Sequence, residues 1–311
     1  MKEIVVLGST NTDMVIAADH LPVPGETICD GSFKMHPGGK GANQAVAVAR
    51  LSAAPDTCAF IAKVGDDLFG SETGDRLRRD RIVPKLVVDR ENPSGTALIL
   101  VDKNGQNVIS VALGANGTLS PDDIAPYLDD IRNAKVLLMQ LETPVPTVAA
   151  AAACAHAAGT LVVLNPAPAA RLPPALFADV DWITPNETEA EILTGVKVTD
   201  AASAKAAAGA LKALGVGHVV ITMGSRGCYC ADTDRVYPCR PVKAVDCVAA
   251  GDTFNGAFAV ALAEGRSVEE AIDFGQKAAA ISVTRVGAQP SVPSRDEVAS
   301  WNGGRADAAT R

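Results

Sequence analysis

Aromatic residues are scarce in this chain, and neither a long apolar run nor an excess of positive charge is present. Phe, Trp and Tyr make up 4% of the 311 residues, whereas hydrophobic residues of all kinds reach 48%. A core built from small aliphatic side chains suits helices packed closely on a sheet. No apolar run approaches the roughly 18 residues of a membrane-spanning helix, so we expect no membrane partner. The net charge of −8 argues against a nucleic-acid partner, because surplus Lys and Arg would be needed to neutralise phosphates.

The beginning of the chain also lacks the features of a secretory leader. Its apolar stretch, IVVL at 4–7, is followed at once by Gly8, which is too short for the apolar region of a leader. The seven cysteines are odd in number and are scattered rather than spaced as a disulfide framework. We therefore expect reduced thiols in a cytoplasmic protein.

Strand-like and helix-like segments alternate along most of the chain. Such alternation predicts parallel βαβ units and an α/β fold, with a doubly wound, mostly parallel central sheet flanked by helices. The expected strands lie at 3–8, 57–64, 135–140, 160–164, 181–184 and 217–222, with a hairpin region at 227–240. The expected helices lie at 41–53, 68–80, 146–158, 186–194, 201–214, 251–263 and 267–284.

Two segments interrupt this alternation and read as short strands. They lie at about 13–36 and 94–112, and the second contains Lys103-Asn104-Gly105, a strong hairpin signal. We expect both to form a small β-sheet lid over a ligand site at the carboxyl edge of the main sheet. The chain is thus predicted to be a single domain over 1–301, with these inserted lid strands and a loose tail at 302–311.

The strongest local motif is AAGDTFNG at 249–256, where small residues run directly into an apolar helix. The free amides at the start of that helix can point at one anion. Gly251 would allow a tight turn and the close approach of a phosphate. Asp252 could take the proton from a hydroxyl that attacks phosphorus. The alternative is that Asp252 only caps the helix.

A second cluster, GGKGAN at 38–43, is rich in glycine but lacks the G-x-x-x-x-G-K-[ST] pattern of a phosphate loop. Lys40 and Asn43 could donate hydrogen bonds to a polar ligand. Asn11-Thr12-Asp13 follows the first strand, and Glu142 follows a later one. Carboxylates, amides and a lysine together suit a neutral polyhydroxyl ligand. The alternatives are a helix N-cap for the first carboxylate and a solvated charge for the second.

Two more clusters follow predicted strands. Asn186 opens the segment NETE, whose acidic residues would usually complement the helix dipole. Beside a nucleotide they could instead hold Mg²⁺ through water. The Gly-rich turn TMGSRG at 222–227 suits contact with nucleotide phosphate or ribose, although the same residues would make an ordinary lead into a hairpin.

With these clusters in this order, the chain resembles the ribokinase and phosphofructokinase-B family of carbohydrate and nucleoside kinases. The similarity covers almost the whole chain. It is carried by VVLGSTNTD, PGET, GGKGANQA, MQLE, NPAPA, ITPNETEAE, TMGSRG, AAGDTFNGA and TRVGAQPSVP. Asp13, Glu142, Asn186 and Asp252 all match the motifs of this family, and the motifs follow one another in the family's order. Four independent matches outweigh the alternative roles of these residues. The resemblance implies transfer of the γ-phosphate of ATP to the 5-hydroxyl of D-ribose, with Asp252 as the base.

The resemblance also implies a role for each matching residue. The anion hole would come from Ala249, Ala250 and Gly251. The sugar would be held by Asn11, Thr12, Asp13, Gly39, Lys40, Gly41, Ala42, Asn43 and Glu142. ATP would contact Asn186, Thr222, Met223, Gly224, Ser225, Arg226, Gly227, Gly251, Asp252 and Gln276. Glu189 would organise Mg²⁺, and an activating monovalent cation, usually K⁺, would be bound by Asp246, Val248, Ser282, Arg285, Gly287 and Ser291.

The chain departs from the family signature at Cys247, where a small hydroxyl residue normally follows the aspartate. A thiol is a poorer hydrogen-bond partner than a hydroxyl. In this family the lid sheets of two chains pack together, so a homodimer is expected. Asn11-x-Asp13 and GGKGANQA favour ribose, with 2-deoxyribose, fructose or a nucleoside as alternative acceptors. A non-catalytic sugar-binding protein is a further alternative, although the presence of Asp252 weighs against it.

Overall fold

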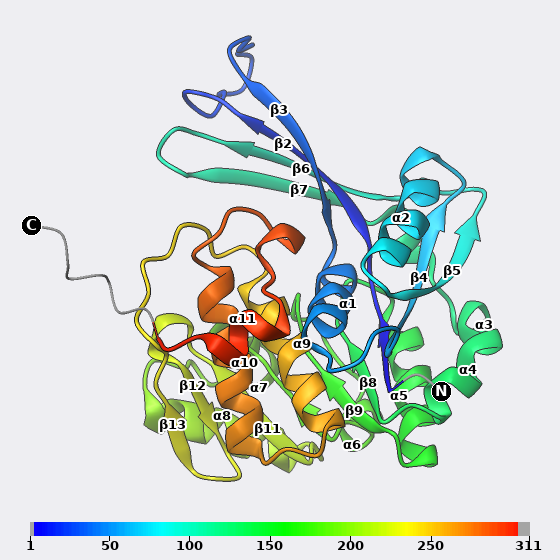
Figure 1. The fold of residues 1–311 in the computed structure, drawn as a ribbon, viewed down its shortest axis with the longest axis vertical. Helices are drawn as coiled ribbons and strands as arrows, with labels where there is room; N and C mark the ends of the chain where they lie inside the picture. The colour runs from blue at the N-terminus through cyan, green and yellow to red at the C-terminus, as the bar shows by residue number, and fades with distance from the viewer. Residues whose placement is uncertain (1–2, 304–311) are drawn as a thin grey trace, which may run out of the picture.

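The computed structural model of this protein describes residues 3–303, which form an α/β body with a small sheet projecting from it (Figure 1). The main sheet has nine strands in the order β13-β12-β11-β10-β9-β8-β1-β4-β5. The strands from β11 to β5 are parallel to their neighbours, and β12 and β13 are antiparallel. Their bounds are β1 (Ile4–Leu7), β4 (Cys58–Gly65), β5 (Val83–Asp89), β8 (Val136–Met139), β9 (Leu161–Leu164), β10 (Trp182–Ile183), β11 (His218–Thr222), β12 (Cys228–Cys230) and β13 (Arg235–Tyr237). The predicted α/β fold with a mostly parallel central sheet is confirmed.

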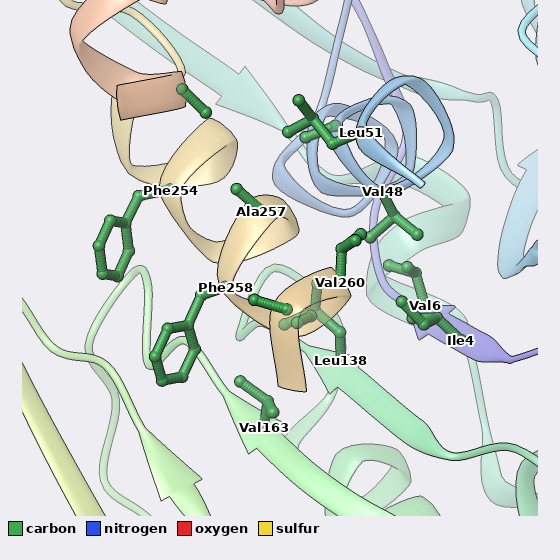
Figure 2. Packing of buried hydrophobic residues seen from close by; sticks show 14 of the residues in the cluster. Ile4, Val6, Val48, Leu51, Leu138, Val163, Phe254, Ala257, Phe258 and Val260 are labelled. Atoms are coloured by element: carbon green, nitrogen blue, oxygen red, sulfur yellow. The ribbon is translucent and has the colours of Figure 1, made fainter. Parts of the chain in front are cut away.

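Helices cover both faces of this sheet. The helices are α1 (Lys40–Leu51), α2 (Leu68–Arg79), α3 (Pro121–Ile124), α4 (Leu128–Arg132), α5 (Val145–Ala158), α6 (Pro174–Ala178), α7 (Glu187–Thr194), α8 (Ala201–Ala213), α9 (Ala250–Ala263), α10 (Val268–Ser282) and α11 (Arg295–Ser300). Alternate residues of a strand point to opposite faces. Ile4 and Val6 of β1 therefore belong to the core that also contains residues of α1, α9 and α10, whereas Val5 and Leu7 belong to the core that contains residues of α5 and α8. Figure 2 shows the first of these cores, with Phe258 of α9 lying beside Val163 of β9.

The projecting sheet has four strands in the order β3-β2-β6-β7. They are β2 (Asn11–Ala17), β3 (Ser32–Gly38), β6 (Gly95–Val101) and β7 (Asn107–Ala112). The second small sheet and its hairpin are therefore confirmed, and Gly105 has the positive φ of 80° that the turn requires. β2 follows β1 closely and β3 leads into α1, so the small sheet is tied to the carboxyl edge of the main sheet (Figure 1).

The edge strand β5 was not predicted from the sequence. It pairs in parallel with β4 and carries Pro84, and most of its residues are only partly buried. Proline and a missing outer neighbour are typical of an edge strand, so this segment lacks the apolar run that marks the inner strands. The tail predicted at 302–311 lies, from residue 304 onward, outside the described residues.

No helix within residues 3–303 combines the length and apolar character that crossing a membrane would need. No disulfide joins the cysteines of residues 3–303; Cys58, Cys228 and Cys230 are buried, whereas Cys29 and Cys247 are exposed.

Candidate active site

The end of β1 and the start of α1 meet backbone against backbone. A Cβ atom at Gly41 would lie 2.5 Å from the amide nitrogen of Ser9, and one at Gly8 would lie 2.9 Å from Cα of Gly41. Gly39 has a φ of 87°, and a Cβ atom there would lie 2.8 Å from the amide nitrogen of Asn11. Only glycine allows this contact, which brings the start of α1 to the carboxyl edge of the sheet.

Residues outside α1 satisfy the first amides of this helix. Gly39 is the N-cap but makes no side-chain cap. The Glu142 carboxylate accepts from the Lys40 amide at 2.9 Å and from Oγ of Ser9 at 2.5 Å. The Ala42 amide donates to the Ser9 carbonyl at 2.8 Å. Glu142 is therefore not a solvated charge, because it holds the start of α1.

Asp13 lies inside β2, so it is not a helix N-cap. Its carboxylate packs over Gly38, where a Cβ atom would come within 2.2 Å of Oδ2. The pKa of Asp13 is raised to about 6, mainly by burial and also by Glu142, while Arg76 lowers it. Thr12, the preceding residue, points to the opposite face of the small sheet, so its side chain is not brought together with Asp13.

Asn11 is buried and oriented by a residue that the sequence analysis missed. Its Oδ1 accepts from Nδ2 of Asn116 at 2.8 Å. Asn116 is fully buried, and it also bonds to the amide and the carbonyl of Thr10. A single asparagine in a short 3-10 helix, Gly114–Thr118, carries no pattern that would have revealed this role.

Asp252 lies in the first turn of α9 with 7% of its surface exposed. Its Oδ2 accepts from Nδ2 of Asn43 and its Oδ1 from Nε2 of Gln44, both at 3.0 Å. Burial raises the pKa of Asp252, while Lys40 and the two amides lower it. Because the carboxylate bonds to α1 rather than to the amides of its own helix, Asp252 does not cap α9.

Lys40 is the cation at the centre of this cluster. Burial lowers its pKa, but the carboxylates of Asp252, Glu142 and Glu189 raise it, and the net shift is upward. Lys40 therefore stays protonated, and three carboxylates from different elements face one positive charge.

The N-terminus of α9 differs in one respect from the prediction. The residue in the left-handed conformation is Ala249, with a φ of 58°, so the expectation that Gly251 permits the turn is wrong. A Cβ atom at Gly251 would have nothing within 4 Å, which leaves open space over the first turn. The Ala250 amide donates to the carbonyl of Cys247 at 3.3 Å.

A pocket of about 710 Å³ lies beside this turn. Seven of the residues predicted for nucleotide binding line it, namely Asn186, Thr222, Gly224, Ser225, Gly227, Gly251 and Gln276. Three others do not line it. Met223 is buried in the core, and the Arg226 guanidinium bonds to Glu187 and to the Thr199 carbonyl. The Asp252 carboxylate bonds to α1 instead. An apolar part of the lining was not predicted from the sequence; it includes Pro241, Val242, Phe254, Ala279, Ala280 and Val283. These residues do not form a motif.

Two polar residues of the pocket are fixed by hydrogen bonds. Gln276 is buried, and its Nε2 donates to the Tyr237 carbonyl at 2.8 Å. Asn186 and Glu189 form a reciprocal capping box at the start of α7, with bonds of 2.8 and 2.9 Å. Burial raises the pKa of Glu189, against the lowering effects of the Asn186 amide and Lys40. Glu189 thus has a structural role and still offers carboxylate oxygen, a donor that suits Mg²⁺.

Three of the six residues predicted to bind K⁺ come together where two loops meet, namely Asp246, Val248 and Gly287. The Asp246 carboxylate accepts from the amides of Val248 and Gly287, both at 2.9 Å. Ser282 and Ser291 are both buried, and each hydroxyl donates to the backbone carbonyl of the residue three positions earlier. The Arg285 guanidinium is paired with Glu297, so only its carbonyl is suited to a cation. Oxygen atoms of these kinds fit a hard monovalent cation.

Comparisons with known proteins identify the family of this chain. The model of the "pfkB family carbohydrate kinase" matches residues 1–295. A ribokinase from Haemophilus influenzae is 45% identical over 299 residues, covering 95% of this chain and 97% of the relative. A deoxyribokinase from Salmonella typhi is 38% identical, with 95% and 97% covered. The structure of an Arabidopsis thaliana ribokinase complexed with ribose and ATP superposes with a TM-score of 0.87 at 32% identity, with 96% and 98% covered. The chain belongs to the pfkB family of carbohydrate kinases.

Proposed function

We propose that this protein is an ATP-dependent ribokinase that phosphorylates the 5-hydroxyl of D-ribose, yielding ribose 5-phosphate and ADP. The observation that carries the proposal is the position of Asp252. It is buried between two amides of α1, at the start of α9, where the large pocket meets the residues proposed to bind the sugar. The ribokinase relatives support ribose as the acceptor.

In this mechanism Asp13, Lys40, Asn43 and Glu142 hold the sugar hydroxyls, and Asp252 accepts the proton of the attacking one. General-base help of this kind contributes about 10²–10⁴ in rate. The open space over Gly251 admits the γ-phosphate to the first amides of α9, which stabilise the charge on the transferring group. The small sheet acts as the lid, excluding water that would compete for the phosphate.

Two cations complete the proposal. Glu189 holds Mg²⁺ through water, and when bound the ion neutralises charge on the ATP phosphates. A monovalent cation, K⁺, would be held by oxygen atoms, several of them backbone carbonyls, of Asp246, Val248, Ser282, Arg285, Gly287 and Ser291. Because Asp246 links the loop before α9 to Gly287, the filled site would keep the anion hole in place.

A homodimer through the lid sheets is also proposed. Five exposed apolar side chains share one face of the small sheet, because residues paired across neighbouring strands point to the same face. Met14 and Ile16 of β2 pair with Met35 and Phe33 of β3. They also pair with Leu98 and Leu100 of β6, and Leu100 pairs with Val108 of β7. Between 38% and 57% of each of the five (Ile16, Phe33, Met35, Leu98 and Val108) is exposed. Asp13 and His36 lie on the opposite face. An apolar face of this kind suits a second copy of the same face.

The cytoplasm is the proposed location, supported by cysteines that form no disulfide within residues 3–303.

Steady-state kinetics on D-ribose, 2-deoxyribose, fructose and adenosine test the choice of substrate. We expect the highest kcat/KM for ribose, because a buried donor or acceptor left unpaired by a missing hydroxyl costs affinity. A higher kcat/KM for 2-deoxyribose would instead make the protein a deoxyribokinase, the activity named for one of its relatives.

A further inference from the structure

Gln44 has no role in the proposed mechanism, yet it makes one of the two side-chain hydrogen bonds to Asp252, the proposed base. Its side chain is fully buried in α1, next to Asn43. Its Nε2 donates to Oδ1 of Asp252 and to Oδ1 of Asn165, at 3.0 Å each. Adjacent residues of one helix thus hold the two oxygens of Asp252 separately: Gln44 holds Oδ1, and Asn43 holds Oδ2.

The charge of Asp252 fixes the direction of the Gln44 amide. A carboxylate only accepts hydrogen bonds, so the Gln44 nitrogen must face it and the Gln44 oxygen must face away. That oxygen accepts from Nε2 of Gln140 at 2.5 Å. The oxygen of Gln140 is then left buried without a hydrogen-bond partner in the described part of the chain. A buried oxygen without a partner costs free energy. The Gln44 and Gln140 amides therefore keep these orientations despite the penalty at the Gln140 oxygen.

The same network continues from Asn165 to the backbone of α9. Nδ2 of Asn165 donates to the Thr184 carbonyl at 3.2 Å, and Oγ1 of Thr184 donates to Oδ1 of Asn255 at 2.5 Å. Nδ2 of Asn255 donates to the Gly251 carbonyl at 2.9 Å. All of these side chains are buried. The network therefore holds both the side chain of Asp252 and the backbone next to it.

We propose that Gln44 is a positioning residue that selects which oxygen of Asp252 takes the proton. Its hydrogen bond keeps Oδ1 as an acceptor, so the proton goes to Oδ2. This inference rests on the proposed function: the Asn43 amide turns to the bound sugar and frees Oδ2. The O–H bond of the sugar hydroxyl then breaks and its proton binds Oδ2. The sugar oxygen forms its bond to the γ-phosphorus as the bond between that phosphorus and ADP breaks.

The charges around Asp252 come from three other places. Lys40 of α1 and Glu142 after β8 act on its ionisation, and Glu189 of α7 is within electrostatic reach. A substitution of Gln44 leaves all three unchanged. A change in the ionisation of Asp252 in such a variant therefore reports the lost hydrogen bond.

The test is Gln44→Met, which keeps the length of the side chain and removes the donor. We expect kcat at pH 7 to fall about tenfold to a hundredfold, the range for a lost bond to a charged group. Losing a donor to the charged form raises the pKa of Asp252, so the acidic limb of the kcat/KM profile should move up by about one pH unit. The Kd for ribose should change less than about threefold, because Gln44 does not contact the sugar. Thr147→Val is the matched control: it removes a buried hydroxyl that donates to the Leu119 carbonyl, and it should leave the limb in place.

A second variant and a direct titration keep the test decisive. Gln44→Glu is nearly isosteric and places a second carboxylate beside Asp252, so it should move the limb up as well. Carbon-13 NMR of labelled aspartate, with the Asp252 signal assigned from Asp252→Asn, follows the pKa without turnover. An unchanged pKa in both folded Gln44 variants overturns the inference. If the wild-type protein phosphorylates no sugar, the proposed function fails, and the NMR titration still decides the role of Gln44.

Discussion

Asp13 is a partly buried carboxylate whose pKa of about 6 places its titration close to neutral pH. In the proposed function its charged form accepts hydrogen bonds from sugar hydroxyls. As the pH falls through about 6 the group takes up a proton and loses that capacity. The Kd for ribose, measured by calorimetry without ATP, should therefore rise up to about tenfold per pH unit below 6. In Asp13→Asn the Kd for ribose should be higher and nearly independent of pH between 5 and 8.

The same group should reduce stability above its folded pKa. The unfolded carboxyl ionises near 3.8 and the folded one near 6, so the free energy of unfolding decreases as the pH rises through this window. Asp13→Asn should be more stable than the wild type at pH 8, by on the order of 2 kcal/mol. Thermal unfolding at pH 5 and pH 8 measures this, and an equal effect of the substitution at both values would contradict it.

Single residues of the site were predictable only where they belong to a motif. Lys40, Asn43 and Asp252 lie in Gly-containing motifs where helices begin, and the structure does bring them together. Gln44 and Asn116 act through bonds to residues about one hundred to two hundred positions away. Asn116 belongs to no motif. Gln44 lies within GGKGANQA, but nothing in that string shows that its amide reaches Asp252.

At the level of elements, two glycines that look alike in sequence have different functions. Gly41 is required by packing, because a Cβ atom would clash with the backbone of Ser9. Gly251 is not required by the fold, because its Cβ atom would meet nothing. Gly41→Ala should therefore lower the free energy of unfolding by about 3 kcal/mol. Gly251→Ala should leave it unchanged or raise it by up to about 1 kcal/mol.

Activity should separate the two variants in the opposite sense. In Gly251→Ala the new methyl group occupies the space proposed for the γ-phosphate, so kcat should fall at least about tenfold in a fully folded protein. Chemical denaturation and a coupled kinase assay on the same samples provide both values. If Gly251→Ala turns over as fast as the wild type, the γ-phosphate does not bind over Gly251.

The elements themselves were largely predictable, because most strands are apolar runs between helices of regular period. The exceptions have physical causes. The edge strand β5 is half-buried and contains Pro84, so it lacks that signal. The residue with left-handed backbone before α9 is Ala249. The sequence instead pointed to Gly251, because glycine adopts a positive φ at no cost.

At the scale of the whole molecule, the apolar face of the small sheet should hold two copies together. Met35→Asp with Leu98→Asp places charges in the centre of that face, so light scattering should show the mass of a monomer where the wild type shows a dimer. Leu214→Asp, at a site of 42% exposure outside the small sheet, is the control and should remain dimeric. A wild-type protein that is monomeric at micromolar concentration would contradict the proposed interface.

The central claim, phosphoryl transfer to ribose with Asp252 as the base, is tested most directly by Asp252→Asn. Asparagine keeps the size of the side chain but cannot take the proton. The variant should bind ribose with a Kd within about threefold of the wild type, while formation of ribose 5-phosphate from ATP falls by a factor of about 10²–10⁴. Turnover near that of the wild type would show that another group is the base.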